Sequence, residues 1–380
     1  MIATTRPEKS VSEPTLYVAF EVGKKEWHLG MTSGFGIAPW VTTVAAGDLD
    51  GVMRMVARGR RRFALATDCP VVSCYEAGRD GFWIHRALLQ LGFLNRVVDS
   101  SSIEVNRRAR RTKTDRIDAR KLVMMLVRAA LGENNVWREV RVPRVEDEVA
   151  RHISRERSDL VAEQTRVDNQ IGSWLATWGC VVSAQERRKA GWWTTVRDWQ
   201  DAPLPLPVQA RIGRATERLT VITGQIGALK AQQTAALQAA PAGSALPMLV
   251  QLKGIATTGA SVLLDEGLVW RAFQNRREIG GLLGFAPTGY NSGETERDQG
   301  ISGAGNKRLQ AISIQLAWNW VRWQPLSALT QWYRANFGAH KRSRRVGIVA
   351  VARKLLIALW RYVTTGVVPT GAILKAVPAV

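Results

Sequence analysis

Short apolar runs and stretches of helical spacing follow one another in the first third of the chain. Runs rich in β-branched and aromatic residues predict strands, and apolar residues recurring every three or four positions predict helices between them. The predicted strands are 15–23, 27–31, 40–44, 71–76 and 95–99, and the predicted helices are 49–56, 82–91 and one beginning near 115. This part of the chain, residues 15–135, is therefore expected to form an α/β domain.

The order of these elements is three strands, helix, strand, helix, strand, helix. It is the order of a ribonuclease H-like domain. Glu21 closes the first predicted strand, Glu76 closes the fourth, and Asp115 with Asp118 opens the last helix. Carboxylates at these positions are candidates for one shared site.

The middle of the chain, residues 136–245, loses strand character and predicts two long polar helices, from Val145 to about Trp178 and from Pro207 to Leu237. Each has a narrow apolar stripe with charged flanks. This pattern favours an antiparallel hairpin or an intermolecular coiled coil that mediates multimerisation, and a plain helical linker remains open. Between the helices lies a segment rich in tryptophan and proline, which we expect to expose Trp192, Trp193 and Trp199 for docking onto nucleic acid or a partner.

The last region, residues 246–380, is predicted to be mainly helical. Residues 252–260 are similar to the hairpin of a helix-hairpin-helix module, in which glycines let backbone amides approach a phosphate, although an ordinary glycine turn would leave the same pattern. Ser292 and Ser302 lie in glycine-rich loops, where serine is usually a turn former. Ser302 also stands where the N-cap of the following helix is expected. The tryptophans at 318, 320 and 323 lie on an apolar helix and are expected in the core, with platforms for stacking bases as the alternative.

The positive net charge of the chain indicates a polyanionic partner. The chain of 380 residues has 53 Lys plus Arg against 32 Asp plus Glu, a formal net charge of +21. Such a surface is expected to bind nucleic acid, with strong salt dependence. No run of about 20 apolar residues is present, so we expect no membrane association. Residues 1–14 read as a disordered leader of a cytoplasmic bacterial protein, and the three cysteines as buried thiols.

Two carboxylates lie within a dense run of cations at residues 107–121. In a helix, Asp115 and Asp118 share one face, where they could hold a divalent metal while the surrounding cations hold phosphates. The alternative is an acidic pair that is salt-bridged to its neighbours on a solvated helix. The cations that we assign to nucleic-acid binding here are Arg107, Arg108, Arg110, Arg111, Lys113 and Arg116.

The order of several motifs resembles the insertion-sequence-110 family of DEDD transposases, which have a RuvC-like domain and are related to Piv-type DNA invertases. The motifs are the acid at the end of the first strand, Tyr75-Glu76-Ala77-Gly78, residues 113–119, Gly-x-x-Pro at 284–287, Ser292-Gly293 and Ile-Ser-x-x-Gly-Asn-x-x-Leu at 301–309. The resemblance covers roughly residues 15–130 and 246–325. It implies a recombinase that is guided by a structured bridge RNA, acts on donor and target DNA, and forms a covalent serine–DNA intermediate.

The resemblance also implies the site. Glu21, Glu76, Asp115 and Asp118 would form the catalytic tetrad and hold Mg²⁺ or Mn²⁺, although the family usually has aspartate at the first position. Glu26 is a weaker alternative to Glu21. The nucleophile would be Ser292, with Ser302 as second choice. Further phosphate-binding cations near the serine would be Arg297, Lys307 and Arg308.

The resemblance further implies a composite site that assembles in a homo-oligomer, a dimer of dimers associated with the nucleoid when it acts. Two other classes remain open. A RuvC-like nuclease would use the same acids with water as the nucleophile, and a non-catalytic RNA- or DNA-binding protein would need the positive charge alone.

Overall fold

The computed structural model describes residues 14–103, 115–183, 185–268, 271, 273–285, 287–292, 295–301, 303, 305–337 and 340–375, with backbone only at Ser101, Asp115, Arg116, 287–292, 295–300 and Lys341. The chain divides into two compact units, residues 1–142 and 143–380. None of the described helices is long and apolar enough to cross a membrane.

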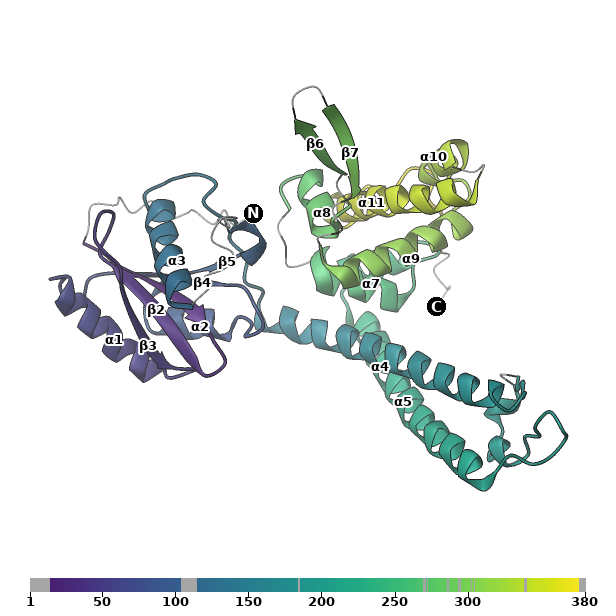
Figure 1. Cartoon of the computed structure of the whole chain (residues 1–380). Helices are drawn as coiled ribbons and strands as arrows, with labels where there is room; N and C mark the ends of the chain where they lie inside the picture. Colours follow the sequence, from purple (N-terminus) through teal and green to yellow (C-terminus); the bar gives the residue numbers. More distant parts are fainter. Residues whose placement is uncertain are drawn as a thin grey trace. The chain divides into compact units, whose positions relative to one another are not determined.

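The N-terminal unit is built on a five-stranded sheet in the order β3-β2-β1-β4-β5 (Figure 1). The strands β1, β2 and β3 form an antiparallel meander, and β4 and β5 extend it in parallel with β1. The bounds are β1 Leu16–Val22, β2 Glu26–Thr32, β3 Trp40–Ala45, α1 Leu49–Arg62, β4 Val71–Glu76, α2 Trp83–Gln90, β5 Leu94–Val98, the short 3₁₀ turn Ser100–Ser102 and α3 Asp115–Ala130. The predicted order of strands and helices is confirmed.

Alternation along β1 separates the two faces of this sheet. Leu16, Val18 and Phe20 are fully buried on the face that packs against α1 and α2. The intervening residues Tyr17 and Ala19 face α3, where they meet the apolar side chains Leu122, Val123, Leu126 and Val127. Because side chains alternate in a strand, the residues at the strand ends are assigned to one face or the other by the same rule.

Two long helices, α4 Val145–Ala176 and α5 Leu206–Ala239, begin the second unit and pack against each other as an antiparallel pair (Figure 1). Their ranges agree with the two helices that the sequence predicts. The amide of Gln164 donates to the hydroxyl of Thr223 across the pair at 2.9 Å. We call these helices and the segment between them the helical hairpin.

The segment between the two helices corrects one prediction. Trp192 is 4 % exposed, because it packs into a small core with Val167, Ile171 and Ile212 and meets Trp193 edge to face at 6.1 Å. Trp199 is 74 % exposed, as predicted. Trp192 and Trp193 therefore help to form a small core at the end of the hairpin. The apolar character of these residues alone did not indicate whether they are buried or exposed. Two 3₁₀ turns, Glu186–Arg188 and Trp192–Thr194, complete this segment.

The remainder of the second unit is mainly helical around one large core. Its elements are α6 Ala245–Gln251, α7 Thr257–Leu263, the π-helix Leu264–Leu268, α8 Arg276–Leu283, β6 Pro287–Ser292, β7 Thr295–Ile301, α9 Lys307–Trp323, α10 Ala328–Phe337 and α11 Lys341–Thr365. The strands β6 and β7 pair as an antiparallel ribbon. Of the three tryptophans predicted in the core, Trp320 is 1 % exposed and confirms the prediction, whereas Trp318 and Trp323 are each nearly half exposed.

The turn between α6 and α7 is the segment that is similar to a helix-hairpin-helix. Gly254 has φ +90°, and a β-carbon there would lie 3.2 Å from the carbonyl oxygen of Asn319 in α9. The amide of Lys253 donates to the carbonyl of Ile373 at 3.0 Å. Packing against α9 and a left-handed backbone thus account for this glycine, and phosphate binding by the turn stays a prediction.

Candidate functional site

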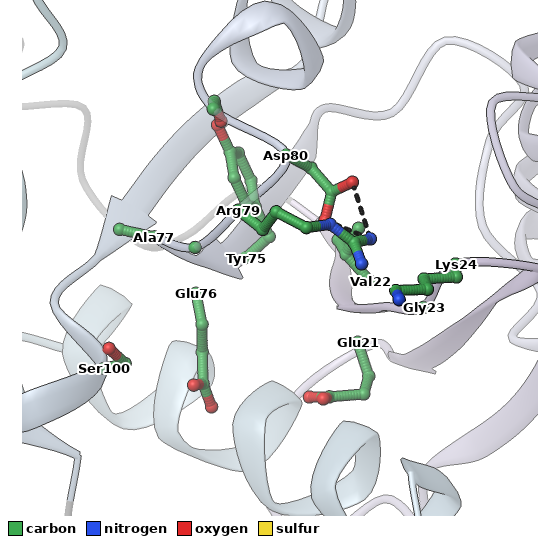
Figure 2. A pocket seen from close by; sticks show the side chains of 12 residues that line it. Glu21, Val22, Gly23, Lys24, Tyr75, Glu76, Ala77, Arg79, Asp80 and Ser100 are labelled. Atoms are coloured by element: carbon green, nitrogen blue, oxygen red, sulfur yellow. Dashed lines mark hydrogen bonds and ion pairs between the residues drawn. The ribbon is translucent and has the colours of Figure 1, made fainter. Parts of the chain in front are cut away.

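A cavity of about 510 Å³ lies where β1 and β4 of the N-terminal unit end. Its lining includes Glu21 and Glu76, and Figure 2 shows both carboxylates extending into the same space. The carboxyl ends of neighbouring parallel strands are the usual place for ligands in open α/β sheets. The two acids that the sequence placed at strand ends therefore belong to one site.

The register of the sheet explains why these carboxylates meet. β1 and β4 are parallel neighbours, with Phe20 opposite Tyr75, so the next residue of each strand is glutamate. By alternation, Glu21 lies on the face of Ala19, and Glu76 lies on the face of Cys74. Both faces are the one that α3 covers.

The first turns of α3 approach this face closely. Gly30 of β2 is paired with Ala19, and a β-carbon on Gly30 would lie 2.4 Å from the carbonyl oxygen of Ala119. Only glycine permits that approach. Asp118, the preceding residue of the helix, has a buried Oδ2 that accepts no hydrogen bond in the part of the chain that the structure describes. A buried carboxylate oxygen without a partner is costly unless a ligand meets it.

The remaining acids and cations predicted for this unit either lie outside the described residues or do not line the cavity. The backbone of Asp115 begins α3, and its side chain, like that of Arg116, lies outside the described residues. The segment with Arg107, Arg108, Arg110, Arg111 and Lys113 also lies outside them. The alternative acid Glu26 is exposed, lies 3.7 Å from His28 and does not line the cavity, which favours Glu21.

Sequence reasoning missed the cationic rim of the cavity. Lys24 and Arg79 line it, and Arg79 pairs with Asp80 at 3.1 Å. The hydroxyl of Tyr75 donates to the carbonyl of Gly81 at 3.0 Å and so anchors the loop that presents them. The signal was available, because loops that follow the carboxyl ends of parallel strands line sites of this kind.

The donor set suits a hard cation. Glu21 and Glu76 line the cavity and offer carboxylate oxygens, which Mg²⁺ and Mn²⁺ prefer. Asp118 is not among the residues that line the cavity, but its Oδ2 is buried and unpartnered among the described residues. Among the side chains that the structure describes, no three acidic, histidine or cysteine groups lie close enough together to hold a metal ion. The side chain of Asp115 is not among them. The nearby Cys74 is no ligand candidate, because burial raises the pKa of its thiol well above the usual value.

In the second unit, Ser292 ends β6 and Arg297 lies in β7, each described by its backbone only, and Ser302 lies outside the described residues. The expectation that Ser302 caps the following helix is wrong. The cap is Asn306, whose Oδ1 accepts the amides of Arg308 at 3.0 Å and Leu309 at 3.1 Å. Asparagine is among the best N-cap residues, and it stands directly before the helix.

A buried polar network lies behind this helix start, which sequence reasoning also missed. Glu266, in the π-helix, is 1 % exposed and accepts two hydrogen bonds from Arg155 of α4, at 2.8 and 3.0 Å. The side-chain amide of Asn306 donates to it at 2.8 Å. Burial opposes the ionisation of Glu266, but these bonds and the positive charge of Arg155 outweigh it, and its pKa is lowered. It is a structural carboxylate.

The pKa of the neighbouring Asp265 is shifted in the opposite direction. Burial raises its pKa to about 6, helped by the charge of Glu266 and opposed by a hydrogen bond with Ser154 and the charge of Arg151. The ion pairs of α4 extend to Arg308, which contacts Asp159 at 2.8 Å. Lys307 donates to the carbonyl of Gly303. These two cations, predicted to bind phosphate, thus already have partners within the chain.

Comparisons with known proteins agree on one family. A sequence model of the IS116/IS110/IS902 transposase family matches residues 247–331. A putative transposase of Sinorhizobium fredii, y4rJ, is 39 % identical over 99 % of both chains. A probable family 20 transposase of Pseudomonas aeruginosa is 26 % identical over 59 % of this chain and 65 % of its own. The transposase of insertion sequence element IS1328 of Yersinia enterocolitica is 24 % identical, covering 81 % and 90 %.

Proposed function

The chain belongs to the IS116/IS110/IS902 family of transposases, and from that premise we propose that it is an RNA-guided DNA recombinase that cuts and rejoins DNA through a serine–phosphodiester intermediate. Action on the DNA of an insertion sequence follows from the family. The guide RNA, the serine intermediate and the metal are the proposed refinements.

The observation that carries this proposal is the pair of carboxylates in one cavity. Glu21 and Glu76 end neighbouring parallel strands on the face that α3 covers, below a rim that contains Lys24 and Arg79 (Figure 2). Acids beside cations suit a phosphodiester, because the cations offset its charge while the acids hold a metal or move protons. We propose that this unit is a RuvC-like, ribonuclease H-like catalytic domain.

In this proposal the metal-binding tetrad is Glu21, Glu76, Asp115 and Asp118. When bound there, Mg²⁺ or Mn²⁺ would polarise the scissile phosphate and offset developing negative charge. Glutamate at the first position is one methylene longer than the aspartate that the family usually has. The strand end holds its backbone, so the longer side chain still reaches the cavity.

Ser292 is the proposed nucleophile. Its Oγ would form a bond to phosphorus while the bond from phosphorus to the leaving sugar oxygen breaks. The serine proton passes to water or a nearby base, and the leaving oxygen takes up a proton. The phosphoserine link keeps the bond energy for rejoining, which free hydrolysis would lose. The match of Ser292-Gly293 to the family's motif supports this assignment.

The proposal places the serine and the acids in different compact units. It therefore requires that both units meet the same DNA, within one chain or between chains of a homo-oligomer such as a dimer of dimers. The bridge RNA is proposed to bind the basic segment that contains Arg107, Arg108, Arg110 and Arg111, with Lys113 and Arg116 beside it. Arg297 is proposed to hold phosphate near the serine.

The test incubates the full chain with Mg²⁺, guide RNA and end-labelled DNA, and then denatures the mixture in hot detergent. We expect labelled DNA attached covalently to the protein, with Ser292 in the modified peptide. Ser292→Ala should abolish the adduct and leave DNA binding intact.

Other outcomes decide between the alternatives. Free cleaved ends without an adduct would indicate a RuvC-like nuclease that uses water. Intact DNA under all metal and RNA conditions would leave a non-catalytic nucleic-acid-binding protein. A modified peptide that carries Ser302 would transfer the nucleophile to that residue.

A further inference from the structure

A second cavity, of about 680 Å³, lies on the helical hairpin, and none of the residues assigned to catalysis lines it. It is an open groove between α4 and α5 and is lined by Arg166, Gln170, Trp174, Arg211, Arg214, Glu217 and Arg218. Four of these seven side chains are arginines and one is acidic, so the lining carries a net charge of +3 (4 − 1). We call it the arginine groove.

Helical spacing sets both walls of the groove. On α4, the residues Arg166 and Trp174 are eight positions apart and share one face. On α5, the positions 211, 214 and 218 recur at intervals of three and four, which also places them on one face. Because the helices are antiparallel, the two rows run along each other and end where the Arg211 guanidinium lies 4.0 Å from the centre of the Trp174 ring.

The cations of the groove are only partly neutralised. Arg166 has an acidic neighbour, Glu163, at 3.5 Å, and both side chains are about half exposed. Among the described residues, Arg214 and Arg218 have neither an ion pair nor a side-chain hydrogen bond, although Glu217 lies between them in sequence. Like charges held together on a folded surface destabilise it, and a polyanionic ligand offsets that cost.

We propose that the arginine groove binds the phosphate backbone of duplex DNA. The row from Arg211 to Arg218 spans about 10 Å at 1.5 Å per residue, which matches about three steps between successive phosphates of one strand at 3.4 Å along the DNA axis. Arginine forks suit phosphate oxygens, and stacking on Trp174 holds one fork in place. A contact with phosphates positions DNA without reading its sequence.

The choice of DNA over RNA rests on the proposed action of this family on DNA. The hairpin would then hold a segment of duplex outside the catalytic cavity. This contact is independent of the chemistry, because it involves neither the acids of the sheet nor Ser292. A catalytically dead variant such as Glu76→Gln should retain it, so failure of the proposed chemistry and failure of the groove are distinguishable.

The test measures the affinity of the full chain for a labelled mixed-sequence DNA duplex as salt is varied. The double variant Arg214→Gln/Arg218→Gln keeps the Arg211–Trp174 stack, so the hairpin should fold normally. Two lost phosphate contacts should make the log–log salt slope shallower by about two, and weaken binding by about tenfold or more near 0.1 M salt. Glu217→Gln should change affinity in the opposite direction, with several-fold tighter binding.

The matched control is Arg188→Gln/Lys189→Gln, which removes the same charge from exposed positions of the hairpin outside the groove. It should leave the slope nearly unchanged, and melting curves should show that both double variants are folded. An unchanged DNA slope in Arg214→Gln/Arg218→Gln would overturn the proposal. The same holds if only the binding of a structured RNA of similar length is weakened.

Discussion

Two pairs of acidic residues in this molecule have opposite environments. Glu21 and Glu76 extend into a cavity at the carboxyl ends of the neighbouring strands β1 and β4. Asp265 and Glu266 lie in a π-helix and are turned toward the chain's own Ser154, Arg155 and Asn306. The difference shows that an acid that lines a cavity is a candidate for chemistry, whereas a buried acid held by side chains of its own core is a structural element.

The largest effect is expected when Glu21 or Glu76, the acids that line the cavity, is neutralised. Glu76→Gln or Glu21→Gln should lower DNA cleavage at least a thousandfold, equivalent to about 4 kcal/mol of barrier, because a carboxylate charge is lost where phosphate is handled. Asp118→Asn should behave alike. The control Glu26→Gln, at the exposed start of β2, should retain activity. Full activity in the folded Glu76→Gln variant would remove this cavity from catalysis.

Neutralising the enclosed pair should act on stability instead. Glu266→Gln leaves Arg155 and Asn306 without their charged partner, and should lower the free energy of unfolding by about 2 to 4 kcal/mol. The partial exposure of Arg155 keeps the loss below that of a fully buried pair. Denaturant titration measures it. Glu163→Gln, which breaks the exposed pair with Arg166, should cost less than about 1 kcal/mol. Equal losses would erase the contrast between enclosed and exposed carboxylates.

Asp265 should make the stability of the protein depend on pH. Its pKa is about 6 in the folded chain against 3.8 ordinarily, so ionisation disfavours the fold. The contribution of Asp265 to the stability of the wild type should therefore be lost as pH rises from about 4 to 6, measured against Asp265→Asn, in which the other carboxylates contribute equally. Asp265→Asn should not show this loss, and should become more stable than the wild type by up to about 3 kcal/mol above pH 6. Denaturation at a series of pH values tests this, and a constant difference between the two proteins contradicts it.

A smaller effect is expected where α3 meets the sheet. Gly30→Ala inserts a methyl group that would lie 2.4 Å from the carbonyl oxygen of Ala119, so α3 must move, at about 1 to 3 kcal/mol. Since Asp118 is on the same turn, cleavage should fall as well. Gly224→Ala is the matched control, because no atom lies within 4 Å of the added carbon in α5. It should stabilise the helix by about 0.5 to 1 kcal/mol.

The sequence predicted the elements well where a local pattern determines them. Alternation and helical spacing gave β1 to β5 in order, and the ends of α4 and α5 to within two residues. Because Glu21 and Glu76 end their strands, the cavity followed from the order of elements alone. Local pattern also reveals which helix face is apolar, since that depends only on neighbours along the chain.

Contacts between distant residues could not be read in the same way. Ser154 and Asp265 are 111 positions apart, and nothing in the run Leu264–Leu268 marks its acids as buried. The cap of α9 was assigned to Ser302 although Asn306 directly precedes the helix, because the helix start was expected too early. The burial of Trp192 was missed because the residues that surround it come from three separate segments of the chain.

The ion pair between Arg155 and Glu266 attaches the helical hairpin to the π-helix, so that movement of the hairpin is coupled to the π-helix. Arg155 lies near the start of α4, and the wall of the arginine groove at Trp174 is about 28 Å further along the helix at 1.5 Å per residue. The other arm, α5, is tied at its base where Thr258 donates to Gln233. A force on the far end of the hairpin is therefore transmitted to the π-helix, which contacts the start of α9 through the hydrogen bond from Asn306 to Glu266. The rigidity of the contact between Arg155 and Glu266 would then limit how far a duplex bound in the arginine groove can move.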